Sequence, residues 1–134
     1  FSVAFENNYT TLVQLLQLGK LTLYSNHRHQ NEPLVVAGGV ATFLNPEPIA
    51  PFVDLFLLGE AENLLEDFIV TLQEVHPDEI SREEQLSHIA QRVSGGYVPS
   101  LFRPENDSYG RLTSFRPIIN IPAKIPVRPA AIEK

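Results

Sequence analysis

The sequence predicts an α/β protein that contains part of a doubly wound parallel sheet, followed by a β-rich, extended C-terminal tail. Two short apolar runs, 34–37 and 54–59, lack the alternation of a half-exposed strand, which indicates strands covered on both faces. Strands that alternate with helices are parallel and joined by right-handed crossovers. We count three predicted strands for this sheet, whereas a doubly wound sheet has about five or six. We therefore expect the first strands upstream of Phe1.

The N-terminal region predicts a strand followed by a helix. Phe1–Phe5 is a short, β-like apolar run. Asn7 or Asn8 can cap a helix over about 9–18, which Gly19 ends. The apolar face of this helix consists of Leu12, Val13, Leu15 and Leu16.

The next region predicts a loop, a buried strand and a short helix. The polar stretch 25–32 is expected to be a surface loop, and the strand 34–37 ends at Gly38-Gly39. Asn45-Pro46-Glu47-Pro48 has the residues of a helix start, with prolines in a first turn whose N–H groups have no helical partner. Pro51 should limit this helix to little more than a turn.

Two longer helices follow the second buried strand, 54–59. In the first, Glu60 and Glu62 lie where the helix dipole favours anions, and apolar residues recur with helical period to about Val75. In the second, Ser81-Arg82-Glu83-Glu84 fits a capping box, and Gly95-Gly96 ends the helix.

The character of the sequence changes at Tyr97. We interpret 1–96 as the C-terminal part of one domain, and 97–134 as a β-hairpin and a proline-rich arm. The strands 97–102 and 112–119 should pair across a turn at 106–110. The later prolines, Pro117, Pro122, Pro126 and Pro129, suit an extended arm or an edge strand.

Composition excludes several kinds of function. The formal net charge of −6 argues against a nucleic-acid surface, which needs a basic stripe. The chain has no cysteine, so it contains no disulfide, thiolate nucleophile or iron–sulfur ligand. No apolar run approaches the roughly 18 residues of a membrane span, and the N-terminus is not a signal peptide. We therefore expect no membrane partner and a cytoplasmic location.

The central motifs resemble a known family. The segments are Gly38-Gly39-Val40-Ala41-Thr42-Phe43-Leu44-Asn45-Pro46-Glu47-Pro48 and Asp54-Leu55-Phe56-Leu57-Leu58-Gly59-Glu60-Ala61-Glu62, with Tyr97-Val98-Pro99-Ser100 after them and Phe1–Tyr9 before them. Together they are similar to the N-terminal, cobalamin-binding-like domain of radical SAM proteins, and to an uncharacterised Asn-Pro-Glu-Pro subgroup. That domain has a Rossmann-type, flavodoxin-like fold.

The resemblance implies a site and several cofactors. Ser2, Gly38 and Gly39 match positions that line the channel for the corrinoid nucleotide tail, and Glu60 lies on the rim that would face the catalytic barrel. The parent protein would hold a [4Fe–4S] cluster and S-adenosylmethionine, and cobalamin is an open alternative. The Asp-x-His-x-x-Gly loop and the cysteine motif of the family are absent and would lie outside this chain.

Each candidate residue also has a plain structural interpretation. Gly38-Gly39 at the carboxyl end of a strand permits close approach of a ligand, but it also suits a tight turn with positive φ. Glu62 is expected only to complement the helix dipole, whereas Glu60 is the better functional candidate. His27 and His29 could bind a metal but lack a third ligand, His76 suits a helix end, and His88 is expected on a solvated helix face.

Two hypotheses of different class follow. The first is an accessory domain that covers the radical SAM barrel of the same polypeptide and has no catalysis of its own. The second is a docking module with a degenerate ligand crevice. An independent hydrolase is disfavoured because no nucleophile–base pair is recognisable. In a crystal, the edge of the Phe1–Phe5 strand should be covered by a symmetry mate, by a second chain or by the proline-rich tail.

Overall fold

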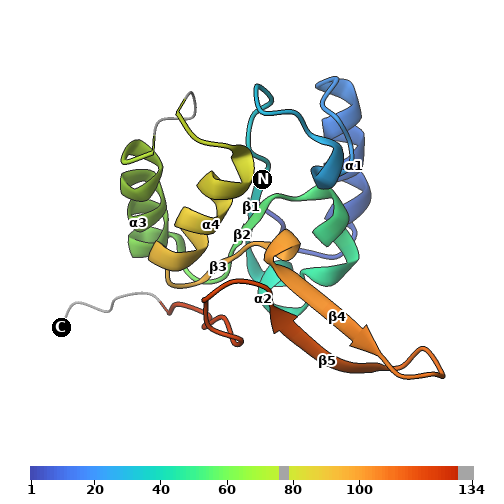
Figure 1. Cartoon of the computed structure of the whole chain (residues 1–134). Helices are drawn as coiled ribbons and strands as arrows, with labels where there is room; N and C mark the ends of the chain where they lie inside the picture. Colours follow the sequence, from blue (N-terminus) through green and yellow to red (C-terminus); the bar gives the residue numbers. More distant parts are fainter. Residues whose placement is uncertain (76–78, 130–134) are drawn as a thin grey trace.

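The computed structural model describes residues 1–75 and 79–129. A small sheet lies between the helix pair α3 and α4 on one side and α1 on the other, and a β-hairpin projects from this body (Figure 1). In chain order the elements are α1 (Asn8–Leu18), η1 (Ser25–His27), β1 (Val36–Gly38), α2 (Val40–Leu44), η2 (Glu47–Phe52), β2 (Leu55–Leu57), α3 (Ala61–Gln73), α4 (Arg82–Arg92), β3 (Gly96–Tyr97), η3 (Pro99–Leu101), β4 (Phe102–Asn106) and β5 (Leu112–Pro117).

The central sheet confirms the predicted α/β class with a partial parallel sheet. β1 and β2 pair in parallel, with Val36 opposite Leu55. The N-terminal segment lies beside β1 through a single parallel bridge between Ser2 and Gly38, so it is shorter than the predicted strand 1–5. The segment therefore lies where the predicted strand order places it, next to β1, and its other edge faces away from the sheet.

β3 differs from the sequence prediction. We expected Tyr97 to begin the hairpin, but it pairs antiparallel with Phe56 of β2. Because β2 is followed by two helices instead of one, the chain comes back to the carboxyl end of β2, where Gly96 begins β3 opposite Leu57. A hairpin does form, but its first strand is β4, Phe102–Asn106, instead of the predicted 97–102, and it pairs with β5 with Phe102 opposite Pro117.

The helices follow local sequence signals closely. α1 ends at Leu18 with Gly19 as C-cap. The capping box at the start of α4 is complete, because the Ser81 hydroxyl accepts from the Glu84 backbone and the Glu84 carboxylate accepts from Ser81. α2 was not predicted, and Pro51 lies inside η2, which is a 3₁₀ helix of six residues. The prediction for His76 lies outside the described residues.

The hydrophobic core joins the layers. Phe56 and Leu55 of β2 are fully buried, between Leu16 of α1 and Ile89 of α4. In α3 the apolar periodicity is only partly buried, because Leu64 is inside whereas Leu65 and Ile69 are 45% and 44% exposed. The predicted face of this helix is therefore wider than the surface it buries against the sheet.

The C-terminal tail returns to the body after β5. Arg128 forms a parallel bridge with Gly59, donating its N–H to the Leu58 carbonyl while its own carbonyl accepts from Glu60. Ile119, Ile121 and Ile125 pack against the core as partly buried side chains. The tail thus covers the end of β2, at a distance in the sheet from the Phe1–Phe5 edge.

Candidate functional site

A cavity of about 480 Å³ lies at the carboxyl ends of β1 and β2, and we call it the carboxyl-end crevice. Ser2, Gly38, Gly39 and Glu60, the four residues singled out from the sequence, all line it. Its apolar walls include Phe43, Leu57, Leu64, Leu65 and Phe68. Open α/β sheets bind their ligands at this edge, so the structure brings the predicted residues together at a place suited to binding.

Close backbone packing explains the glycines of the crevice. Gly39 has φ +119°, and a Cβ there would lie 2.5 Å from the Val3 carbonyl oxygen. Gly59 has φ +150°, and a Cβ there would lie 2.4 Å from the Arg128 carbonyl oxygen. Gly39 therefore fits the interpretation as a tight turn with positive φ. The absence of a Cβ lets the N-terminal segment pack against Gly39, and in the same way lets the tail pack against Gly59.

The electrostatics of the crevice disfavour an anionic ligand. Glu60 is the N-cap residue of α3, exposed, and its backbone N–H is already donated to Arg128. Glu62 lies in the first turn of the same helix, in the position expected for dipole complementation. No lysine or arginine is among the residues that line the crevice. Its chemistry is therefore that of an apolar pocket with one hydroxyl and one carboxylate at its edge.

A buried ion network lies at the other end of β2. The Asp54 carboxylate accepts from Nη1 of Arg28 at 2.6 Å and from Nη2 of Arg82 at 3.0 Å. The same oxygen accepts from the Val35 N–H at 2.7 Å. The remaining guanidinium nitrogens of Arg28 donate to the carbonyls of Thr22, Leu23 and Phe52. The network fastens the loop before β1 to β2 and to the start of α4.

This network corrects the prediction that 25–32 is merely a surface loop. The Arg28 side chain is fully buried, although His27 and His29 on either side are exposed. One signal was present in the sequence: Asp54 begins an apolar run, and a carboxylate buried in a sheet needs a cationic partner. Sequence alone did not identify which arginine that partner would be.

The histidines show no arrangement for metal binding. Over residues 1–75 and 79–129, no group of three or more His, Cys, Asp or Glu side chains could hold a metal ion. His88 is not on a solvated face as expected, because it is half-buried and its Nε2 lies 3.7 Å from a Glu74 carboxylate oxygen. It therefore contributes to the contact between α3 and α4.

A ladder of aromatic rings connects the sheet to the hairpin. The ring of Tyr97 stacks on Phe56 and meets Phe102 edge-on, and Phe102 stacks on Phe115 of β5 with ring centroids 5.3 Å apart. The Tyr97 hydroxyl donates to the Glu47 carboxylate. Burial, together with that carboxylate, raises the pKa of Tyr97 well above its usual range, so the phenol stays protonated.

The fold is that of a small α/β domain, and its crevice lies at the edge where open α/β sheets bind ligands. In the part that the structure describes, no catalytic group is recognisable. Comparison with known families assigns it further. A family model described as the N-terminal region of radical SAM proteins matches residues 1–99, and the chain belongs to this family. No curated protein and no solved structure matches the chain. Among the described helices, none is long and apolar enough to cross a membrane.

Proposed function

We propose that this chain is a non-catalytic accessory domain whose carboxyl-end crevice packs against the catalytic barrel of a radical SAM polypeptide. The family match supports the accessory role. The observation that carries the rest is the mouth of the crevice, where Val40 and Leu65 are 59% and 45% exposed. Apolar side chains gathered around an apolar pocket mark a surface that another surface covers.

The radical chemistry belongs to the rest of the polypeptide in this proposal. The chain has no cysteine to ligate a [4Fe–4S] cluster, which supplies the electron that cleaves S-adenosylmethionine. The domain's own residues have the tasks of presenting an apolar face and excluding water from it. The Asp54 network holds one end of β2, and Gly59 admits the tail at the other, so this face is built on rigid elements.

Hydrogen–deuterium exchange tests the docking. In a radical SAM polypeptide that contains this domain, we expect peptides covering 40–43 and 61–68 to be protected relative to the isolated chain. Leu65→Glu should abolish that protection, because it places a charge at the mouth of the crevice. Val70→Glu is the matched control, since Val70 lies on the same helix with 50% exposure and does not line the crevice. Equal exchange in both contexts would refute the docking.

A corrinoid is the second candidate occupant, and one observation favours it: all four residues implied by the resemblance line one cavity. The walls fit an aromatic ring. They do not suit the phosphate of a nucleotide tail, because the Glu60 carboxylate lies at the edge and no lysine or arginine lines the crevice.

A titration with hydroxocobalamin separates the two occupants. Docking without corrinoid predicts no change of the visible spectrum when the complete polypeptide is titrated. A saturable spectral change that Gly38→Val removes, while the same substitution leaves the exchange protection intact, would establish corrinoid binding instead. Gly38 suits this test because a Cβ there meets Leu57 alone, its carbonyl oxygen at 3.2 Å and its Cβ at 3.9 Å.

A further inference from the structure

A second cavity, of about 350 Å³, lies where the hairpin leaves the body, and we call it the hairpin groove. Its walls come from distant parts of the chain: Tyr24 and Pro51 on the body, and Phe102, Pro104 and Phe115 on the hairpin. Polar groups also line it, among them Asn26, Glu47 and Ser100. It shares no residue with the carboxyl-end crevice.

The aromatic walls are held in place by neighbouring rings. Tyr24 is 47% exposed and its ring contacts Phe52 at 5.3 Å between centroids. Phe115 stacks on Phe102 with an interplanar angle of 14°. Flat faces fixed in this way suit stacking by another planar ring, because little side-chain freedom remains to be lost on binding.

The polar groups of the groove retain hydrogen-bonding capacity. The side chains of Asn26 and Ser100 make no hydrogen bond within the part of the chain that the structure describes. Glu47 accepts from Tyr97 through one carboxylate oxygen, which leaves the other for a donor. An amide, a hydroxyl and a carboxylate beside aromatic faces can recognise the edge of a nucleobase.

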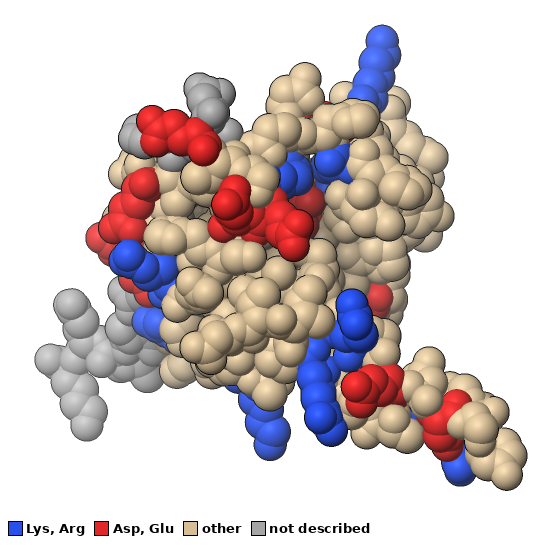
Figure 2. Space-filling model, viewed as in Figure 1, with Lys and Arg blue, Asp and Glu red and all other residues tan. Residues whose placement is uncertain are grey.

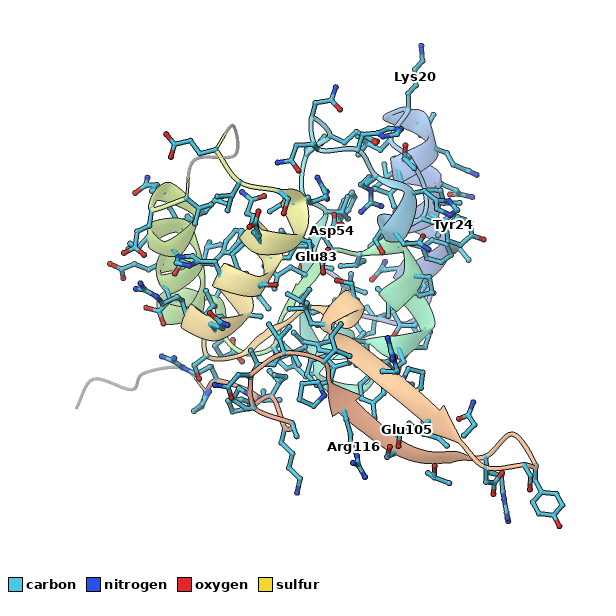
Figure 3. All side chains as sticks on the ribbon, viewed as in Figure 1. Lys20, Tyr24, Asp54, Glu83, Glu105 and Arg116 are labelled. Carbon is cyan, nitrogen blue, oxygen red and sulfur yellow. The ribbon has the colours of Figure 1, made fainter. Side chains whose placement is uncertain are left out.

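Two exposed arginines at the root of the hairpin form no ion pair within the described residues. Arg103 of β4 lies directly opposite Arg116 of β5, and both are exposed. Neither makes an ion pair with any residue that the structure describes. Like charges directly opposite each other destabilise a strand pair, so this pair suits a bound anion. Figure 3 shows Arg116 directed outward from the hairpin.

The charge of the chain is segregated around this region. Residues 1–99 contain thirteen acidic and four basic side chains, whereas 100–134 contain three acidic and six basic ones. Basic groups gather along the edge of the molecule that runs from the tail to the hairpin root (Figure 2). We based the expectation of no nucleic-acid binding on the net charge of the whole chain, which hides the excess of basic residues in 100–134.

We propose that the hairpin groove and the Arg103–Arg116 pair bind nucleotide units, with a base in the groove and phosphates on the arginines. This goes beyond the accessory function and does not depend on it. Alternation along the strands places the arginines on the other face of the hairpin from Pro104 and Phe115. A flexible single strand can bend around the edge of a two-stranded ribbon, which a duplex cannot. An acidic protein surface would use the arginines but leave the aromatic groove without a role.

Fluorescence anisotropy with the 134-residue chain and a labelled, mixed-sequence RNA of about 12 nucleotides tests the proposal. Tyr24→Ala should weaken binding by about tenfold or more, because it removes a stacking face. Arg103→Gln and Arg116→Gln should each reduce the slope of log K against log salt by about 0.7. Arg92→Gln is the control, an exposed arginine on α4 whose loss removes the same charge.

The outcomes are decisive after circular dichroism has shown that each variant is folded. Binding that Tyr24→Ala and the hairpin variants weaken, and Arg92→Gln does not, supports the groove. Absence of saturable binding at low salt overturns the proposal, as does binding that responds equally to all three arginine changes and not to Tyr24→Ala. Adenosine and uridine monophosphates, followed by NMR, identify the source: shifts at the groove as strong as those with RNA indicate a free nucleotide, and weaker ones a strand.

Discussion

At the scale of single residues, one carboxylate holds the loop before β1 in place. Asp54 is 3% exposed and accepts from two guanidinium groups and a backbone N–H. A charge buried this deeply costs little only while its partners are present, and removal of one partner leaves the other uncompensated. The stability of the fold therefore depends more on Asp54 than on a carboxylate in an exposed ion pair.

We expect Asp54→Asn to lower the free energy of unfolding by about 3 to 5 kcal/mol, measured by urea denaturation. The reason is that Arg28 stays buried without its counter-charge. Asp67→Asn provides the comparison, because Asp67 is 48% exposed and lies 3.5 Å from Arg128, so its loss should cost less than about 1 kcal/mol. Similar costs for both variants would mean that the network is not the anchor of the loop.

The lowered pKa of a second carboxylate, that of Glu32, sets how the free energy of unfolding depends on pH. The backbone N–H groups of His29 and Thr22 donate to Glu32 and hold its pKa at about 2, against an ordinary value of 4.5. Because the pKa is lowered on folding, the stabilisation is complete above about pH 4.5 and is lost as the pH falls toward 2. Glu32→Gln should reduce stability at neutral pH and flatten its decline in acid. Glu66→Gln, an exposed change on α3, should leave the shape of the pH profile unaltered.

At the scale of elements, the start of α4 depends on a capping box that was legible in the sequence. Ser81→Ala removes the acceptor for the Glu84 N–H and should cost about 1 kcal/mol in the free energy of unfolding. Ser94→Ala, an exposed change just after the same helix, should be nearly neutral. If thermal melts of the two variants coincide, the box contributes nothing to folding.

Glycine at 39 is a requirement of the contact between the N-terminal segment and β1. Gly39→Ala should cost at least about 2 kcal/mol more than Gly110→Ala, measured by chemical denaturation. Both residues have positive φ, but a Cβ at Gly110 has nothing within 4 Å, whereas one at Gly39 meets Val3. The difference therefore combines the contact with Val3 and the greater strain at Gly39, whose φ of +119° and ψ of 170° are essentially closed to other residues. Equal costs would contradict our explanation of the crevice glycines.

These elements show what could be predicted from sequence and why. Caps and periodic apolar faces are local, so α1, α3, α4 and the two parallel strands could be predicted. Tyr97 could not be placed, since its pairing with β2 depends on where two helices return the chain. Arg28 could not be predicted to be buried either, because its partner Asp54 is 26 residues away in the chain. Ser2, Gly38 and Gly39 were identified through the family resemblance, and strand ends that meet at one edge of a parallel sheet also pointed to Gly38, Gly39 and Glu60.

At the scale of the molecule, the family match and the folded body do not end at the same place. The match covers residues 1–99, yet side chains of the tail after Pro117 pack on the core of that region. The hairpin contrasts with the tail, because it projects from the body and contacts it chiefly at its root (Figure 1). Of the two parts predicted for 97–134, the proline-rich arm thus packs on the core through its isoleucines, whereas the hairpin projects from the body.

A pair of deletions tests this division. A chain that ends at Pro117 loses Ile119, Ile121 and Ile125 and the backbone bridge to Gly59, so its free energy of unfolding should fall by about 3 kcal/mol or more. Replacement of 105–114 by a two-residue turn removes exposed strand ends and should cost less than about 1 kcal/mol. Urea denaturation of both chains measures the two values. A larger loss of free energy for the hairpin replacement than for the tail deletion would show that the hairpin, and not the tail, completes the body. The reason is that only burial against the core can make a terminal segment part of the cooperative folding unit.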